Sequence, residues 1–182
     1  MADTADMGDT VVLTGSRVRL RAPRLEDAEA LFAAIASDPE VTKYLSWTPH
    51  PDVAETRRVI SEMYNIGDER TWLIEMLATS DVVGLCACWR SAGHAVEIGY
   101  CLARAWWGHR IMYEVLGMLL ETLQRDQTVY RVWATCHVDN TRSARLLRRA
   151  GLSLEGRLTR YGMYPNLSPE PQDSLLFAKA LR

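Results

Sequence analysis

The turn between residues 102 and 111 has the composition of an anion-binding site. A strand-like apolar run, residues 95–102, precedes one glycine, Gly108, at which a long helix is predicted to begin. The first N–H groups of a helix lack carbonyl partners, and the helix dipole places partial positive charge at the same end. Such a junction can hold a diphosphate, although an ordinary strand-to-helix turn could have the same composition.

A second polar group stands where another helix is predicted to begin. Asn140 is a suitable N-cap, and Ser143 falls in the first turn of that helix. Capping alone would explain both residues, and it would also fix where the helix starts. The same helix has a basic side, which in most proteins is solvated, formed by Arg142, Arg145, Arg148 and Arg149.

The cysteines and histidines form no recognisable metal or nucleophile motif. Cys86 and Cys88 lie two residues apart on a predicted strand, and no Cys/His pair at zinc spacing accompanies them. Cys136 and His137 are adjacent but have no third partner in the sequence, so a thiol nucleophile is not expected. We predict no metal site and four reduced, buried thiols.

Hydrophobic periodicity and turn residues predict the elements that position these groups. The predicted helices cover residues 25–36, 52–65, 108–124 and 140–150. The predicted strands cover 11–22 (a pair or one bent strand), 71–76, 82–89, 95–102, 130–136, 152–161 and 174–180. Residues 41–51 are predicted to be irregular, and a proline-rich loop is expected between the last two strands.

The order of these elements predicts an α/β protein of the α+β type with a mixed sheet. Hairpins in the middle of the chain make the sheet mostly antiparallel, and a later strand–helix–strand crossover adds a parallel pair with helices on both faces. Residues 1–9 are expected to be a disordered tail, and residues 10–182 a single domain.

Composition narrows the classes of partner. The chain has 182 residues, 48% of them hydrophobic, with 21 basic and 23 acidic side chains. A net charge of −2 argues against a nucleic-acid partner, because proteins that bind phosphate backbones usually carry a surplus of basic residues. The longest apolar stretch, residues 82–89, is too short to span a bilayer, and the acidic N-terminus is unlike a secretory signal. A cytoplasmic protein with no nucleic-acid or membrane partner is therefore expected.

Four short motifs occur in a characteristic order: Glu97-Ile98-Gly99-Tyr100, Trp107-Gly108, Asn140-Thr141-Arg142-Ser143 and Gly151-Leu152-Ser153-Leu154-Glu155-Gly156. Together they resemble the GNAT superfamily of acyl-CoA-dependent N-acyltransferases. Within it, they are most similar to the RimJ/RimL-like branch, the ribosomal-protein-alanine type of acetyltransferase. The resemblance extends from about Val18 to Leu181.

The resemblance implies acetyl-CoA as cosubstrate and a V-shaped split between the strands at 95–102 and 130–136. The pantetheine arm of CoA would enter this split and pair with main-chain groups near Cys101 and Leu102. Amides from about Gly108 to Met112 would hold the diphosphate, and Arg142 and Arg145 could reach the 3′-phosphate. The residues so assigned to the cofactor are Cys101, Leu102, Trp107, Gly108, His109, Arg110, Ile111, Met112, Asn140 and Ser143.

The resemblance also implies catalytic roles. Glu97 is expected to be the general base, directly or through water, because an amine must lose a proton before it attacks and a partly buried carboxylate has a raised pKa. Alternatively, Glu97 could be a surface residue or only bind the amine. An N–H near Leu102 would stabilise the oxyanion. Many relatives place a tyrosine where this chain has Leu147, so Ser143 or water must protonate the leaving thiolate.

The chain departs from the family pattern at Ala105, where Gln or Arg is usual, and at Arg110, where a small residue is usual. Arg110 could hold a phosphate directly, or its bulk could block the backbone approach that glycine allows. The acceptor pocket is expected between the loop of Tyr44 and Trp47 and the loop at residues 162–173. Tyr44, Trp47 and Glu97 would then contact the acceptor.

The sequence therefore predicts an N-acetyltransferase that moves an acetyl group from acetyl-CoA to a primary amine in a ternary complex. The acceptor is either a protein N-terminal α-amine or a small-molecule amine, and a homodimer is one possible assembly. Two alternatives stay open. One is a catalytically degenerate acyl-CoA-binding or regulatory module, which Ala105, Arg110 and Leu147 would favour, and the other is a transferase for a larger acyl chain.

Overall fold

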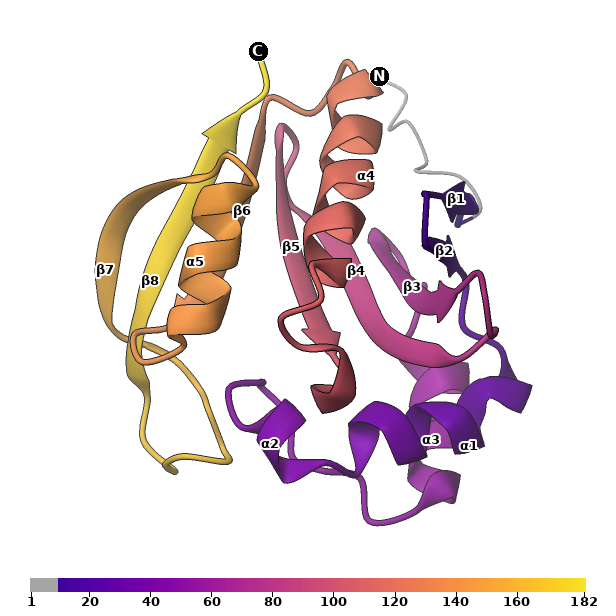
Figure 1. Cartoon of the computed structure of the whole chain (residues 1–182). Coiled ribbons are helices and arrows are strands. Elements are labelled where there is room, and N and C mark those ends of the chain that lie inside the picture. The colour runs from indigo at the N-terminus through magenta and orange to yellow at the C-terminus, as the bar shows by residue number, and fades with distance from the viewer. Residues whose placement is uncertain (1–9) are drawn as a thin grey trace.

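A computed structural model describes residues 10–182, and the predicted tail at residues 1–9 lies outside this range. Eight strands form one sheet in the order β1-β2-β3-β4-β5-β6-β8-β7 (Figure 1). They are β1 (Leu13–Thr14), β2 (Val18–Arg21), β3 (Glu69–Met76), β4 (Val82–Ala92), β5 (Ala95–Leu102), β6 (Arg131–His137), β7 (Ser153–Gly162) and β8 (Gln172–Ala180). Every neighbouring pair is antiparallel except β5 and β6. The predicted mixed, mostly antiparallel sheet is confirmed.

Two helices begin directly after the residues predicted to cap them. In α3 (Val53–Glu62) the Asp52 side chain accepts from an N–H of the first turn, and in α5 (Thr141–Arg149) Asn140 does the same. The long helix α4 (Ile111–Arg125) begins three residues later than predicted, because Arg110 has left-handed backbone angles and ends the preceding turn.

The N-terminal helical region differs most from the prediction. The helix expected at residues 25–36 is divided into a 3₁₀ turn (Leu25–Asp27), α1 (Ala28–Leu31) and a π-helical turn (Phe32–Ala36). A short helix, α2 (Pro39–Thr42), begins just before the stretch predicted to be irregular, residues 41–51, and extends into it. Its start has a local cause, since the Asp38 side chain accepts the N–H of Glu40 and proline is favourable in the first turn.

Two apolar clusters pack on opposite faces of the sheet. On one face, α4 and α5 cover a large core that includes Leu116, Leu119, Leu147 and Phe177. On the other, α1 and α3 cover a smaller core, formed by Ala28, Leu31, Ile35, Val41, Ile60, Leu73, Leu85 and Ala103. Helices on both faces are thereby confirmed. Within residues 10–182, no helix is both long and apolar enough to cross a membrane.

The parallel pair β5–β6 is short. Its strands pair at Ala95↔Arg131, Val96↔Val132 and Glu97↔Trp133 only. Beyond Glu97 the strands diverge (Figure 1), and β6 instead pairs with β8 along its whole length. The predicted splayed pair is therefore confirmed, with Glu97 and Trp133 at its apex.

Candidate functional site

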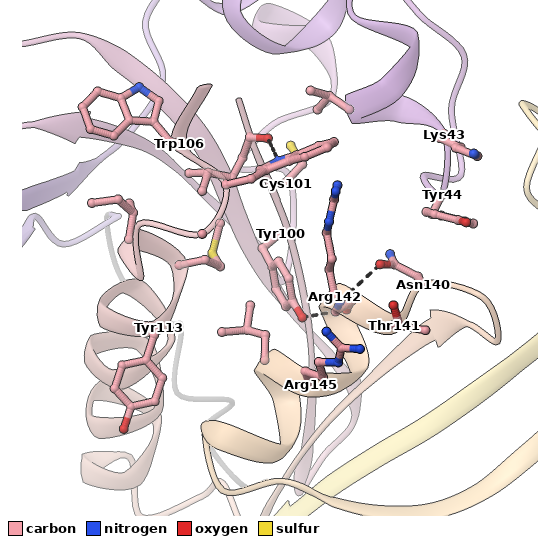
Figure 2. Close-up of a pocket in the computed structure, with 18 of the residues that line it drawn as sticks. Lys43, Tyr44, Tyr100, Cys101, Trp106, Tyr113, Asn140, Thr141, Arg142 and Arg145 are labelled. Atoms are coloured by element: carbon pink, nitrogen blue, oxygen red, sulfur yellow. Dashed lines mark hydrogen bonds between the residues drawn. The ribbon is translucent and has the colours of Figure 1, made fainter. Parts of the chain in front are cut away.

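A cavity of about 980 Å³ lies at the open end of this split, between the start of α4, the start of α5 and the loop after α2 (Figure 2). Most residues predicted to bind the cofactor line it, namely Cys101, Leu102, Trp107, Gly108, Arg110, Ile111, Met112, Asn140 and Ser143. Tyr44 also lines it. His109 does not: it is exposed, and its ring lies against that of Trp106.

The cavity wall has an excess of basic residues, five against the acidic Glu40 and Asp139. Its basic lining residues come from three separate segments: Lys43, Arg110, Arg142, Arg145 and Arg149. The Arg142 guanidinium lies 4.4 Å from the ring centre of Trp107, which holds it at the mouth of the split by a cation–π contact. Guanidinium groups suit phosphate oxygens, so this wall fits the phosphates of a nucleotide cofactor.

Main-chain groups of β5 face into the split. The Ala103 N–H donates to Val83 O at 2.8 Å, and this pair continues the β4–β5 register. Because hydrogen-bonded and non-hydrogen-bonded positions alternate in an antiparallel ladder, Cys101 directs its main chain to β4, while Tyr100 and Leu102 direct theirs toward β6. Leu102 O accepts the Trp107 indole N–H at 2.7 Å. The Leu102 N–H thus faces the split, as the oxyanion prediction requires.

The turn before α4 has an open backbone. Gly108 has φ +82°, and a Cβ built there would meet nothing within 4 Å. The N–H groups of Ile111, Met112 and Tyr113 open the helix without carbonyl partners in its own first turn. An open glycine, free amides and a cationic wall together fit a diphosphate, so the residues present suit acetyl-CoA.

Ser143 has a partner that the sequence analysis missed. Its Oγ lies 2.8 Å from the Tyr100 hydroxyl, and its N–H donates to Asn140 Oδ1 at 3.2 Å (Figure 2). Both Tyr100 and Ser143 line the cavity. Leu147, at the position where relatives place a tyrosine, is fully buried in the core, so it offers no proton. The only sequence signal for Tyr100 was its place in the Glu97–Tyr100 motif.

Glu97 lies at the apex of the split and does not line the main cavity. Its neighbours Val96 and Ile98 belong to the core under α4, so side-chain alternation places Glu97 on the opposite face of the sheet. Burial raises the pKa of Glu97 from 4.5 to about 7, and a hydrogen bond from Trp89 opposes that rise. The raised pKa expected for a partly buried carboxylate at this position is present.

An aromatic cluster connects the two loops predicted to border the acceptor pocket. The Tyr44 ring stacks on His137, the last residue of β6, with ring centres 5.2 Å apart. Tyr164, from the loop between β7 and β8, meets the same imidazole edge-on at 4.9 Å. The His137 Nδ1 accepts the N–H of Asp139 at 3.1 Å, which fixes the ring. The two loops thus meet at the open end of β6.

Asn166 joins the same loops by hydrogen bonds. Its side-chain NH₂ donates to Thr42 O and to Trp47 O, each at 2.8 Å. Trp47 lines a second cavity, of about 360 Å³, rather than the main one, and it packs against the core under α1 and α3. The structure therefore brings Tyr44 to the main cavity and leaves Trp47 beside it.

The remaining reactive groups form no second centre. Burial raises the pKa of all four cysteine thiols, so these side chains are neutral thiols at neutral pH. Among residues 10–182, no group of three or more His, Cys, Asp or Glu side chains could hold a metal ion.

Comparison with known proteins identifies the family. Residues 17–153 match the family described as "Acetyltransferase (GNAT) domain". The chain is 34% identical to the uncharacterized N-acetyltransferase p20 of Bacillus licheniformis over 151 residues, 80% of this chain and 84% of that protein. It is 36% identical over 67 residues to the [ribosomal protein uS5]-alanine N-acetyltransferase of Escherichia coli, covering 37% of this chain and 34% of that one.

The fold also matches solved structures. The ribosomal L7/L12 α-N-protein acetyltransferase RimL, solved in complex with coenzyme A, superposes with a TM-score of 0.81 at 22% identity, covering 93% of this chain and 98% of that one. These matches agree with the predicted RimJ/RimL-like branch, enzyme class and acetyl-CoA cosubstrate. On the match over residues 17–153 and the p20 relative, the chain belongs to the GNAT family of N-acetyltransferases.

Proposed function

We propose that this enzyme transfers an acetyl group from acetyl-CoA to a primary amine, with both substrates bound at once. The observation that carries the proposal is the split itself: β5 and β6 separate immediately after Glu97, with a cationic cavity at the open end and a carboxylate at the apex. A cofactor arm lying along β5 would therefore place its thioester in the split, where an amine could approach it from the Glu97 side.

The cofactor supplies an acyl group activated as a thioester. Arg142, Arg145 and Arg149 would bind its phosphates, and the amides that open α4 would hold the diphosphate. The Leu102 N–H faces the split and is the donor proposed for the developing oxyanion. Ser143, held by Tyr100, is proposed to donate a hydrogen bond to the leaving sulfur.

Glu97 is proposed as the general base, directly or through water. With a pKa of about 7, roughly half of its side chains are ionised at neutral pH, so it can accept a proton from an incoming ammonium. An unperturbed glutamate would be ionised as well, but it would be a much weaker base. Burial at the apex therefore matches the basicity of Glu97 to the pH at which the reaction must run.

The proposed acceptor is a protein N-terminal α-amine or a small-molecule amine. The E. coli relative, matched over about a third of its length, acts on the alanine of a ribosomal protein, which supports the first. A donor larger than acetyl, a homodimer and a cytoplasmic location stay predictions.

Calorimetric titration with acetyl-CoA and CoA, followed by a free-thiol assay on a panel of N-terminal peptides and small amines, tests the proposal. We expect micromolar or tighter CoA binding and thiol release with at least one acceptor class. Binding without thiol release across the panel would instead support the acyl-CoA-binding module.

Substitution of the base sharpens this test. Glu97→Gln should lower kcat/KM by about 100-fold or more and remove the ionisation near pH 7 from the rate profile, with CoA affinity unchanged. Glu69→Gln is the matched control. Glu69 on β3 pairs with Trp89 on β4, which in turn pairs with Glu97 on β5, so the two glutamates flank the same tryptophan. Unchanged turnover and an unchanged pH profile in Glu97→Gln would exclude Glu97 as the base.

A further inference from the structure

Trp89 lies beside Glu97 on the face of the sheet opposite α4. The two residues are direct cross-strand partners in the β4–β5 ladder. The indole leans toward Gly99, because a Cβ built on that glycine would lie 3.3 Å from Trp89 Cη2. The Trp89 side chain also donates a hydrogen bond to the Glu97 carboxylate, so this indole reaches onto β5 on one side of that group.

Trp133 covers the other side. It is the partner of Glu97 on β6, yet its indole N–H donates to Ser91 Oγ on β4 at 2.8 Å. Ser91 Oγ in turn donates to Ala95 O. Since β5 lies between β4 and β6, the indole must cross β5 on its Ala95 side, and Ala95 is only 6% exposed.

Glu97 thus lies between two indoles that cross its own strand. The charged groups nearest in the ladder are engaged elsewhere: Glu69, beyond Trp89, accepts from Thr71 Oγ1, and Arg131, two residues before Trp133, pairs with Glu155. Burial, not a neighbouring charge, accounts for the raised pKa of Glu97. The two indoles are the neighbours of Glu97 on either side in the ladder.

We propose that Trp89 and Trp133 form an ammonium clamp that binds the acceptor as an organic cation and positions it over Glu97. Indole faces attract cations, most strongly where water is excluded, and the carboxylate between them supplies a negative charge opposite the ammonium. The inference rests on the proposed function. In the clamp, one N–H bond of the ammonium breaks, the proton forms an O–H bond with Glu97, and the nitrogen keeps the electron pair with which it attacks.

The clamp makes a prediction about Glu97 that needs no acceptor. In protein labelled with ¹³C at the glutamate carboxyl, with the Glu97 signal assigned by its loss in Glu97→Gln, the titration midpoint should be about 7. Trp133→Leu should lower it by about one unit, because water regains access to the carboxylate. Trp89→Leu should lower it less, because that variant also loses the indole hydrogen bond that holds the pKa of Glu97 down. A midpoint that stays unchanged in both variants would overturn the proposal.

Two milder variants guard against misfolding. Ser91→Ala keeps both rings and removes the tether of Trp133 together with the Ser91 bond to Ala95 O, so it should lower the midpoint by less than Trp133→Leu does. Tyr130→Leu removes an exposed aromatic ring just before β6 and should leave the midpoint unchanged. An equal shift in Tyr130→Leu would mean that the effect is not specific to the clamp.

Cation binding is tested with tetramethylammonium and with tert-butanol, a neutral molecule of similar shape. In wild-type protein, tetramethylammonium should shift the indole N–H resonances of Trp89 and Trp133, and tert-butanol should not. Trp133→Leu should weaken tetramethylammonium binding about fivefold or more. Equal responses to both probes would overturn the cation preference.

These readouts separate the clamp from the base. If the Glu97 midpoint depends on the indoles while Glu97→Gln keeps full turnover, the proposed base is wrong and the clamp stands as a binding site. If the midpoint is independent of the indoles, the clamp is wrong whatever the turnover.

Discussion

Replacement of Arg110 by glycine should change stability and cofactor affinity in opposite directions. Arg110 has φ +62° and ψ +16°, a left-handed conformation at the N-cap of α4. Its side chain is exposed and lines the cationic cavity. The residue therefore combines a strained backbone with a charge placed where phosphates are proposed to bind.

The magnitudes follow from these two roles. Left-handed geometry destabilises a non-glycine residue by about 1–2 kcal/mol, and the greater freedom of glycine in the unfolded chain returns up to about 1 kcal/mol. Arg110→Gly should thus stabilise the fold by up to about 1 kcal/mol, a rise in Tm of about 2–4 °C. Loss of one charge-assisted contact, worth about 1.5–3 kcal/mol, should weaken CoA binding by about 10- to 100-fold.

Thermal unfolding without cofactor and calorimetric titration with CoA measure the two effects separately. Arg110→Asn is a useful control, because asparagine tolerates the left-handed conformation and also removes the charge. It should lose CoA affinity as Arg110→Gly does, whereas Arg110→Lys should keep most of it. Tighter CoA binding in Arg110→Gly would show that the arginine obstructs the site, and a fall in Tm would refute the argument from strain.

Two further substitutions test the loops and the sheet. Asn166→Ala leaves Thr42 O and Trp47 O without their donor, so it should lower the free energy of unfolding by about 1–3 kcal/mol. It should also raise KM for the acceptor, while the affinity for CoA, measured by calorimetry, stays constant. Burial raises the pKa of Glu75, but hydrogen bonds, the strongest from Arg21, outweigh it and hold the pKa below its usual value. The stability that follows is present above the unfolded-state pKa of about 4.5 and is lost as pH falls through the lower folded-state value. Glu75→Gln should therefore lose about 3 kcal/mol in urea unfolding at pH 7 and show a smaller decrease toward pH 3 than wild type does; equal decreases would contradict this assignment.

Local signals predicted much of the fold. Asp52 and Asn140 marked the starts of α3 and α5 because a cap acts within one helical turn. The Asp38-Pro39 pair carried the same kind of signal for α2, but a proline there is equally typical of the end of the preceding helix, and the aromatic and proline residues of 41–51 favoured an irregular stretch. The split between β5 and β6 came from resemblance alone, since no local property of either strand sets where they separate.

The finer structure of the site depends on contacts between distant residues. The Tyr100–Ser143 hydrogen bond joins positions 43 residues apart, and it could not be inferred without knowing that the start of α5 lies close to β5 in the fold. Likewise, Trp89 and Trp133 flank Glu97 only because three strands pair in one register. A shift of either neighbour by one residue would place its indole on the opposite face of the sheet, and composition and periodicity do not determine that register.

The charges on the two sides of the split explain why two substrates could enter without competing. The cavity at the open end is cationic, through Arg142, Arg145 and Arg149, and attracts a polyanionic cofactor while repelling an ammonium. The opposite face near the apex carries Glu97 between two indoles and has the reverse preference. If each substrate is attracted by the charges on its own side of the split, added salt should weaken CoA binding more than acceptor binding. The arginines are exposed and the clamp is half-buried, and salt screens charges less where water is excluded.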